Sequence, residues 1–196
     1  MDYKAYWQQD GLQNLTAGDD DCPEGFDPVK FVWSIISKAH CYDKLTDFGC
    51  GAGRLCRVTS PESYIGIDLN PDAIAAAKAA NPEYSFQEVN VKSEYPRSDI
   101  CLAYTVFLHL DDDALRGTLT RLKAAGNKSI IIAEVLGQEW RRPGNPPVFN
   151  RDLGDYLEIM AEFGYLLKWA DSRVYERYAY CAPDRNVRLF GLLFVC

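Results

Sequence analysis

The stretch Leu45-Thr46-Asp47-Phe48-Gly49-Cys50-Gly51-Ala52-Gly53-Arg54 decides the fold of this 196-residue chain. An acidic residue stands before three glycines that occupy alternate positions. Glycine is favoured in such a turn because a side chain would collide with a ligand that lies against the backbone. We therefore interpret the stretch as a strand, a ligand-binding turn and the start of a helix.

Short β-type runs alternate with helical stretches along most of the chain. We expect strands at 44–48, 63–68, 84–89, 99–104, 129–135, from 165 onward and at 187–195. Helices are expected at 28–39, 71–80, 112–125 and 153–163. In the helix at 71–80, Asn70 can act as the N-cap and Pro71 suits the first turn. Strands that alternate with helices indicate an α/β fold with a parallel sheet covered on both faces.

Two acidic residues indicate the kind of ligand. Asp68 ends the second strand, about twenty residues beyond the glycines, where a carboxylate can accept both hydroxyls of a ribose. Dinucleotide sites prefer the spacing Gly-x-Gly-x-x-Gly, whose helix N-terminus faces a pyrophosphate. The spacing here is Gly-x-Gly-x-Gly, and Asp47 disfavours pyrophosphate but suits an ammonium group. The pattern favours S-adenosylmethionine.

At this point the sequence resembles a known family. The glycine stretch is similar to motif I of the class I (Rossmann-like) S-adenosylmethionine-dependent methyltransferases. Further similar segments are Tyr64–Asn70, Phe86–Val91, Asp99–Tyr104 and Val106–Leu110. The similarity is close over 44–135 and limited to the element pattern over 155–196. It implies a mostly parallel seven-stranded sheet with helices on both faces and the last strand antiparallel.

The resemblance also implies a cofactor site. Motif I contacts the methionine end, Asp68 holds the ribose, and the family often has Asp where Asn90 stands. The candidate cofactor-binding residues are Asp47, Gly49, Cys50, Gly51, Asp68, Leu69, Asn90, Val91 and Ala103. In this reading Leu69 and Val91 sandwich the adenine, Asn90 reads its edge, and the backbone of Ala103 holds the amino group.

Two residues are candidates for catalysis. His109 follows the fourth strand, where many relatives face the methyl donor, and an imidazole suits a general base near neutral pH. The alternative is a half-buried histidine that packs near the helix start. Glu134 ends the fifth strand and can face the substrate or hydrogen-bond within the fold. Asp111–Asp113 is interpreted as a helix N-terminus, and no metal site is expected.

The composition of the chain limits the classes of partner and the cellular compartment that we expect. The net charge is −7 and the pI is near 4.9, which argues against binding bulk nucleic acid. No apolar stretch approaches the roughly 20 residues of a membrane span, and no signal peptide is evident. Seven cysteines without Cys-x-x-Cys spacing indicate a reducing compartment. We expect a cytoplasmic protein, and the oligomeric state stays open.

We expect one methyltransferase domain over 1–196, with an N-terminal cap segment at 1–40 and a Rossmann-like core at 41–196. Tyr3, Tyr6 and Trp7 have helical spacing, and in relatives this element covers the cofactor. The predicted activity is methylation of an oxygen or nitrogen of a small-molecule acceptor. The alternatives are a non-catalytic cofactor-binding module that serves a partner protein and a nucleotide-dependent oxidoreductase, which the glycine spacing opposes.

Overall fold

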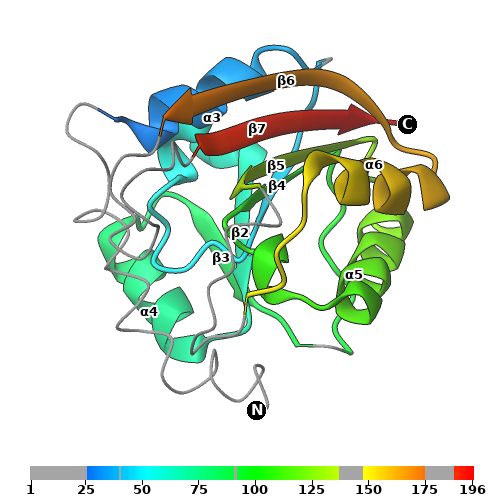
Figure 1. The fold of residues 1–196 in the computed structure, drawn as a ribbon. Helices are drawn as coiled ribbons and strands as arrows, with labels where there is room; N and C mark the ends of the chain where they lie inside the picture. Colours follow the sequence, from blue (N-terminus) through cyan, green and yellow to red (C-terminus); the bar gives the residue numbers. More distant parts are fainter. Residues whose placement is uncertain (1–25, 40, 91, 137–147, 175–187) are drawn as a thin grey trace.

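A computed structural model describes residues 26–39, 41–90, 92–136, 148–174 and 188–196. Its centre is a seven-stranded sheet with the order β3-β2-β1-β4-β5-β7-β6 (Figure 1). The strands are β1 (Leu45–Phe48), β2 (Tyr64–Asp68), β3 (Ser85–Glu88), β4 (Ile100–Tyr104), β5 (Ser129–Val135), β6 (Leu166–Val174) and β7 (Arg188–Val195).

The strand directions confirm the predicted sheet. Strands β1 to β5 pair in parallel, whereas β7 runs antiparallel to both of its neighbours, β5 and β6. Every residue of β4 and β5 is buried. Their mostly apolar sequences agree with this, because a strand in the middle of such a sheet is covered on both faces.

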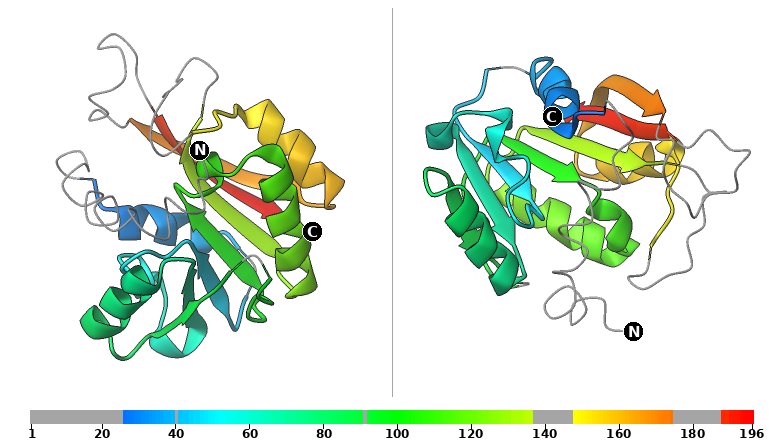
Figure 2. Two further views of the ribbon diagram at one scale, coloured as in Figure 1. Left: turned by 90° about the horizontal axis from the view of Figure 1, so that it is seen from below. Right: turned by 90° about the vertical axis from the view of Figure 1, so that its left-hand side faces the viewer.

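Helices cover both faces of the sheet, as Figure 2 shows. Helices α3 (Pro28–Ile36) and α4 (Pro71–Ala80) share one hydrophobic cluster with β1, β4, β5 and β7. Helices α5 (Asp112–Ala124) and α6 (Leu153–Glu162) share the other cluster. Among the described helices, none combines the length and apolar character needed to cross a membrane.

Part of the predicted N-terminal segment lies in the core. Helix α3 buries Phe31, Val32 and Ile35 against the sheet. It approaches β7 so closely that a Cβ on Gly191 would lie 2.3 Å from Cδ1 of Ile35. The aromatic residues Tyr3, Tyr6 and Trp7 lie outside the described residues, and their predicted role over the cofactor stays a prediction.

The helix ends follow the sequence signals. The side chain of Asn70 accepts hydrogen bonds from the backbone N of Asp72 and Ala73, so it caps α4 as predicted. Asp111 caps α5 by accepting from the backbone N of Ala114 at 2.8 Å. The acidic run at 111–113 is therefore a helix N-terminus, where carboxylates oppose the positive end of the dipole.

The connection from β1 to β2 differs from the prediction. The glycine turn does not open an α-helix; it continues through turns into the 3-10 helices η1 (Cys56–Val58) and η2 (Pro61–Ser63). Pro61 lacks an N–H and disfavours helical geometry at the residue before it. With Pro61 interrupting the segment just before β2, the chain forms 3-10 helices and turns in place of the helix that we expected here.

Candidate active site

The glycine turn at the carboxyl end of β1 depends on an unusual backbone. Gly49, Gly51 and Gly53 have φ angles of +74°, +54° and +83°, a region that side chains disfavour. Because the positive φ angles occur at every second residue, glycine is favoured at every second position of the turn. A Cβ on Gly49 would also lie 2.6 Å from Cγ2 of Val106, so the turn packs directly against the segment that follows β4.

Asp68, at the end of β2, is hydrogen-bonded to this turn. Its Oδ2 accepts from the backbone N of Gly51 at 2.9 Å, and its Oδ1 accepts from the backbone N of Asn70 at 2.9 Å. Burial raises the pKa of Asp68, while these backbone hydrogen bonds oppose the rise. Each carboxylate oxygen can accept a second bond. Asp68 is only half-buried and can therefore accept hydrogen bonds from a ligand.

Asp47 lies in β1, two residues before the first glycine of the turn, and is 2% exposed. Its carboxylate accepts from the hydroxyl of Tyr64 at 2.6 Å. Burial raises the pKa of Asp47 to about 6, while the Tyr64 bond and the charge of Arg54 oppose the rise. Arg54 lies 4.5 Å from the ring centre of Tyr104. The sequence pattern predicted a role for Asp47 but not its hydrogen bond with Tyr64.

The predicted adenine side follows β2 and β3. Leu69 is half-buried beside Asp68, and Asn90 is exposed. A hydrogen bond joins the carboxyl ends of β2 and β3, since the backbone N of Val89 donates to the carbonyl of Asp68 at 2.8 Å. Oδ1 of Asn90 accepts from the backbone N of Lys92 at 2.8 Å, so a local turn fixes this side chain. Val91 lies outside the described residues.

Cys50 and Ala103 are buried. A Cβ on Gly66 would lie only 2.8 Å from the sulfur of Cys50, so this thiol packs closely against the glycine. Burial raises the pKa of the Cys50 thiol well above the ordinary value. Ala103 is paired in register with Phe48 of β1. Both side chains belong to the core, so any contact with a cofactor at these positions would come from backbone atoms.

Glu134 lies near the end of β5 and is 1% exposed. Oε1 accepts from the backbone N of Leu108 at 3.1 Å, and Oε2 accepts from the hydroxyl of Tyr156 on α6. Burial raises the pKa of Glu134 to about 7; the Tyr156 and Leu108 bonds and the charge of Arg151 oppose the rise. A lone carboxylate in an apolar strand signals that a partner must exist, but the sequence does not say which residue it is.

His109 ends the 3-10 helix η3 (Phe107–His109) between β4 and α5. The residue is half-buried, and its backbone N donates to the carbonyl of Val106 at 2.9 Å. Because Val106 contacts Gly49, the structure brings the segment that carries His109 against the glycine turn. The glycine turn, Asp68, His109 and Glu134 thus gather at the carboxyl ends of the parallel strands, where ligands of open α/β sheets bind.

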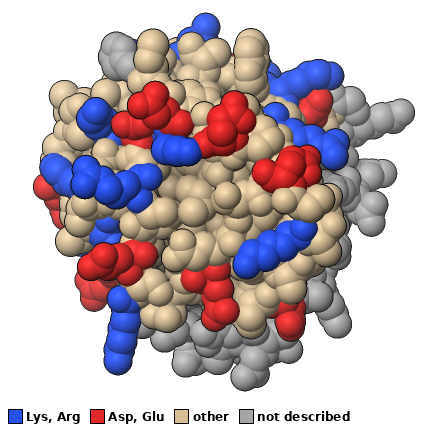
Figure 3. Space-filling view, turned by 180° about the vertical axis from the view of Figure 1, so that it is seen from behind, with Lys and Arg blue, Asp and Glu red and all other residues tan. Residues whose placement is uncertain are grey.

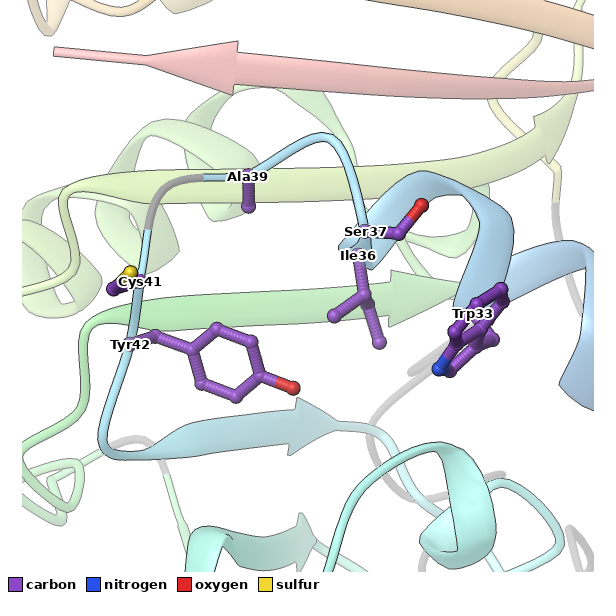
Figure 4. Close-up of a pocket in the computed structure, with 6 residues that line it drawn as sticks. All are labelled: Trp33, Ile36, Ser37, Ala39, Cys41 and Tyr42. Atoms are coloured by element: carbon purple, nitrogen blue, oxygen red, sulfur yellow. The ribbon is translucent and has the colours of Figure 1, made fainter.

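A hollow of about 410 Å³ lies elsewhere, beside α3 (Figure 4). It is lined by Trp33, Ile36, Ser37, Ala39, Cys41 and Tyr42. Cys41 and Tyr42 precede the amino end of β1, so the hollow is separate from the site at the carboxyl ends. Within the described ranges, no group of three or more His, Cys, Asp or Glu residues is placed to hold a metal ion.

Comparison with known proteins agrees with this geometry. A family model described as a methyltransferase domain matches residues 46–127. Over these residues the chain is therefore similar to methyltransferase domains. The architecture is that of the class I S-adenosylmethionine-dependent methyltransferases, which confirms the resemblance seen in the sequence. A search of curated proteins finds no match.

Solved methyltransferase structures share the fold. Magnesium protoporphyrin IX methyltransferase from Synechocystis PCC 6803 has a TM-score of 0.74 at 14% identity, with 99% of each chain covered. Human N-acetylserotonin methyltransferase has a TM-score of 0.62 at 17% identity, covering 98% of this chain and 58% of that one. A methyltransferase from Haloferax volcanii, solved with the Trm112 activator, has a TM-score of 0.67 at 13% identity over 99% and 97%.

Proposed function

We propose that this chain binds S-adenosylmethionine and transfers its methyl group to an oxygen or nitrogen of a small-molecule acceptor. The observation that carries the proposal is the half-buried carboxylate of Asp68, hydrogen-bonded to Gly51 of the left-handed glycine turn. A carboxylate that can accept ribose hydroxyls, beside a turn that can approach the rest of the nucleoside, supports the proposal. The Synechocystis and human neighbours were solved with S-adenosylhomocysteine or S-adenosylmethionine bound.

The charges at the turn favour this cofactor over a dinucleotide. Asp47 and Asp68 are close enough for the charge of Asp68 to raise the pKa of Asp47. Two neighbouring carboxylates repel a pyrophosphate, whereas they attract the ammonium and sulfonium groups of S-adenosylmethionine. The oxidoreductase alternative therefore has the glycine spacing and the local charge against it.

Positioning dominates the proposed mechanism. S-Adenosylmethionine supplies a methyl group that is already activated for transfer. Holding an acceptor in line with it can lower the barrier by about 7–11 kcal/mol. We assign His109 the role of a general base, which takes the proton from a hydroxyl or ammonium acceptor and contributes about 10²–10⁴-fold.

A small acceptor agrees with the charge of the protein and with its neighbours. The Synechocystis and human neighbours are named for small molecules, a porphyrin and N-acetylserotonin. On the face shown in Figure 3, basic side chains are interspersed with acidic ones. Such a face does not attract a phosphate backbone. We also propose a cytoplasmic location, supported by the buried free thiols of Cys50, Cys56 and Cys101.

A cofactor-binding module that serves a partner is the second candidate. One observation favours it, namely that the Haloferax neighbour was solved with an activator protein. Such a module would bind the cofactor but would not turn over until the partner is added. The two candidates therefore differ in the activity of the isolated chain.

Calorimetry with S-adenosylhomocysteine and with NADH tests the cofactor. We expect binding of the first and none of the second; the reverse would overturn the proposal. Methyl-labelled S-adenosylmethionine, incubated with a metabolite extract, tRNA or DNA, then tests the acceptor. Label in the metabolite fraction alone is the expected result. Salt-sensitive labelling of either polymer would overturn the small-molecule assignment.

A further inference from the structure

One guanidinium holds both ends of the segment that carries His109. Arg151, just before α6, donates to the carbonyl of Phe107 at 3.1 Å and to that of Leu110 at 2.7 Å. Its other bonds go to Asp112 in the first turn of α5, at 2.7 and 3.1 Å. The side chain of Arg151 is 4% exposed. Because an arginine presents its donors in a rigid planar fork, these bonds define the position of η3.

Glu134 and Tyr156 hold the middle of the same segment. The carboxylate of Glu134 accepts from the backbone N of Leu108, and the hydroxyl of Tyr156 donates to that carboxylate. Tyr156 is 1% exposed, and the Arg151 guanidinium lies 5.8 Å from its ring centre. We call Arg151, Glu134 and Tyr156 the clamp. Its members come from β5, α6 and the residue that precedes the N-cap of α6.

The held segment begins in a strained conformation. Thr105, directly after β4, has a φ angle of +54°, and it is the only residue other than glycine with a positive φ in the described part of the chain. A β-branched residue in this region is a rare outlier, and such strain costs about 1–3 kcal/mol unless surrounding contacts impose it. The clamp and the hydrogen bond from the backbone N of Thr105 to the carbonyl of Ala133, at 2.9 Å, supply such contacts.

The same segment contacts the glycine turn. Val106 follows Thr105, and its Cγ2 occupies the space that a Cβ on Gly49 would need. Three residues later the segment presents His109. A shift of the segment would therefore change the distance between His109 and any ligand on the glycine turn.

We propose that the clamp of Arg151, Glu134 and Tyr156 is a positioning device, which fixes His109 relative to the cofactor bound at the glycine turn. The clamp residues are buried within the protein and act through the backbone of residues 107–110. Glu134 is accordingly a positioning residue, and the proton-accepting role belongs to His109. This inference rests on the proposed function.

Tyr165 provides a matched control for the clamp. It is 1% exposed, as Tyr156 is, and its hydroxyl donates to the carbonyl of Asn127 at 2.6 Å. Asn127 precedes β5, so this bond lies at the amino end of the strand that carries Glu134 near its carboxyl end. Y156F and Y165F each remove one buried hydroxyl, but only Y156F removes a hydrogen bond of the clamp. R173K serves as the control for R151K, because Arg173 forms a partly exposed ion pair with Asp171 on β6.

Histidine NMR measures the position of His109 without any acceptor. The chain contains two histidines, His40 and His109, so a protein labelled in its histidine rings gives two sets of signals. His40→Asn assigns them. On addition of S-adenosylhomocysteine, we expect the His109 signals to move in the parent, Y165F and R173K. In Y156F and R151K we expect at least half of this shift to be lost, with the dissociation constant within threefold of the parent.

Activity and spectra together distinguish the outcomes. With the acceptor identified, kcat of Y156F should fall at least tenfold below that of Y165F, while KM for S-adenosylmethionine stays within threefold. His109 signals that match the parent in both Y156F and R151K, with and without S-adenosylhomocysteine, would overturn the clamp. A parent that binds no S-adenosylhomocysteine would overturn the proposed function instead, and the ligand-free spectra would still test the clamp.

Discussion

Two carboxylates lie at or near the carboxyl ends of strands in the same sheet, but one is partly exposed and the other is buried. Asp68 ends β2 and is half-buried, and it accepts hydrogen bonds from the backbone N of Gly51 and of Asn70. Glu134 lies near the end of β5, is 1% exposed and is covered by Tyr156 and the segment after β4. Burial raises the pKa of both groups. A raised pKa therefore does not distinguish the carboxylate that we propose to bind the cofactor from the one that we propose to act within the clamp.

The difference lies in what each carboxylate can still accept. Asp68 holds the glycine turn and keeps lone pairs on a partly open side chain, so it can serve both the turn and a ligand. Glu134 directs its two oxygens to protein donors inside the core. Perturbed groups cluster at functional sites, but a group at such a site can act on the ligand directly or only on the residues that do.

Stability gives the largest expected contrast. E134A leaves the backbone N of Leu108 and the hydroxyl of Tyr156 buried without their acceptor. We expect it to lower the free energy of unfolding by about 2–4 kcal/mol, because each unsatisfied buried group costs about 1–3 kcal/mol. D68A, with its more open site, should cost less than half as much. Urea denaturation of both variants measures this, and equal losses would contradict the contrast.

Turnover tests the residue that the clamp presents. H109A should lower turnover by at least a hundredfold, which corresponds to about 2.7 kcal/mol, and should leave cofactor affinity within a fewfold. The reason is that a hydroxyl or ammonium acceptor must lose a proton, and a neutral imidazole can take it near pH 7. The acidic limb of the pH–rate profile should disappear in the same variant. A destabilised but fully active H109A protein would show that His109 only packs.

Cofactor affinity should separate the two carboxylates. D68A should weaken binding of S-adenosylhomocysteine by at least tenfold, or about 1.4 kcal/mol, because it removes the predicted ribose acceptor. E134Q should stay within threefold of the parent, as should E83A, which removes an exposed carboxylate before β3. Calorimetry measures all three. If D68A binds as the parent does, the assignment of Asp68 to the ribose is wrong.

Local sequence signals predicted most of the fold but little of the clamp. The caps at Asn70 and Asp111 and the apolar runs of β4 and β5 are properties of neighbouring residues, so they could be recognised in the sequence. The helix expected after the glycine turn was wrong, because Pro61 interrupts the segment just before β2 and the chain forms 3-10 helices and turns there. Glu134, Arg151 and Tyr156 come together only when the sheet and α6 pack, and no spacing in the sequence encodes that contact.

The pH dependence of stability gives the smallest and most specific test. The folded-state pKa of Glu134 is raised to about 7, above its value of about 4.3 in an unfolded chain. Between these values the folded protein keeps a proton that the unfolded chain has released. Its free energy of unfolding must therefore fall as pH rises through this window. Between pH 6 and 7.5 we expect Glu134 to account for a loss of about 1 kcal/mol, since one pKa unit corresponds to about 1.36 kcal/mol.

E134Q isolates this contribution, because glutamine does not titrate and has nearly the same shape. Asp47, whose pKa is raised to about 6, titrates in the same direction and contributes less in this range. We therefore expect the decline from pH 6 to pH 7.5 to be clearly smaller in E134Q than in the parent, and D47N to remove only a minor part of it. Urea denaturation at the two pH values gives the slopes. A decline in E134Q equal to that of the parent would mean that the Glu134 carboxyl titrates near its ordinary pKa, and that burial among Tyr156 and the segment after β4 does not hold a proton on it.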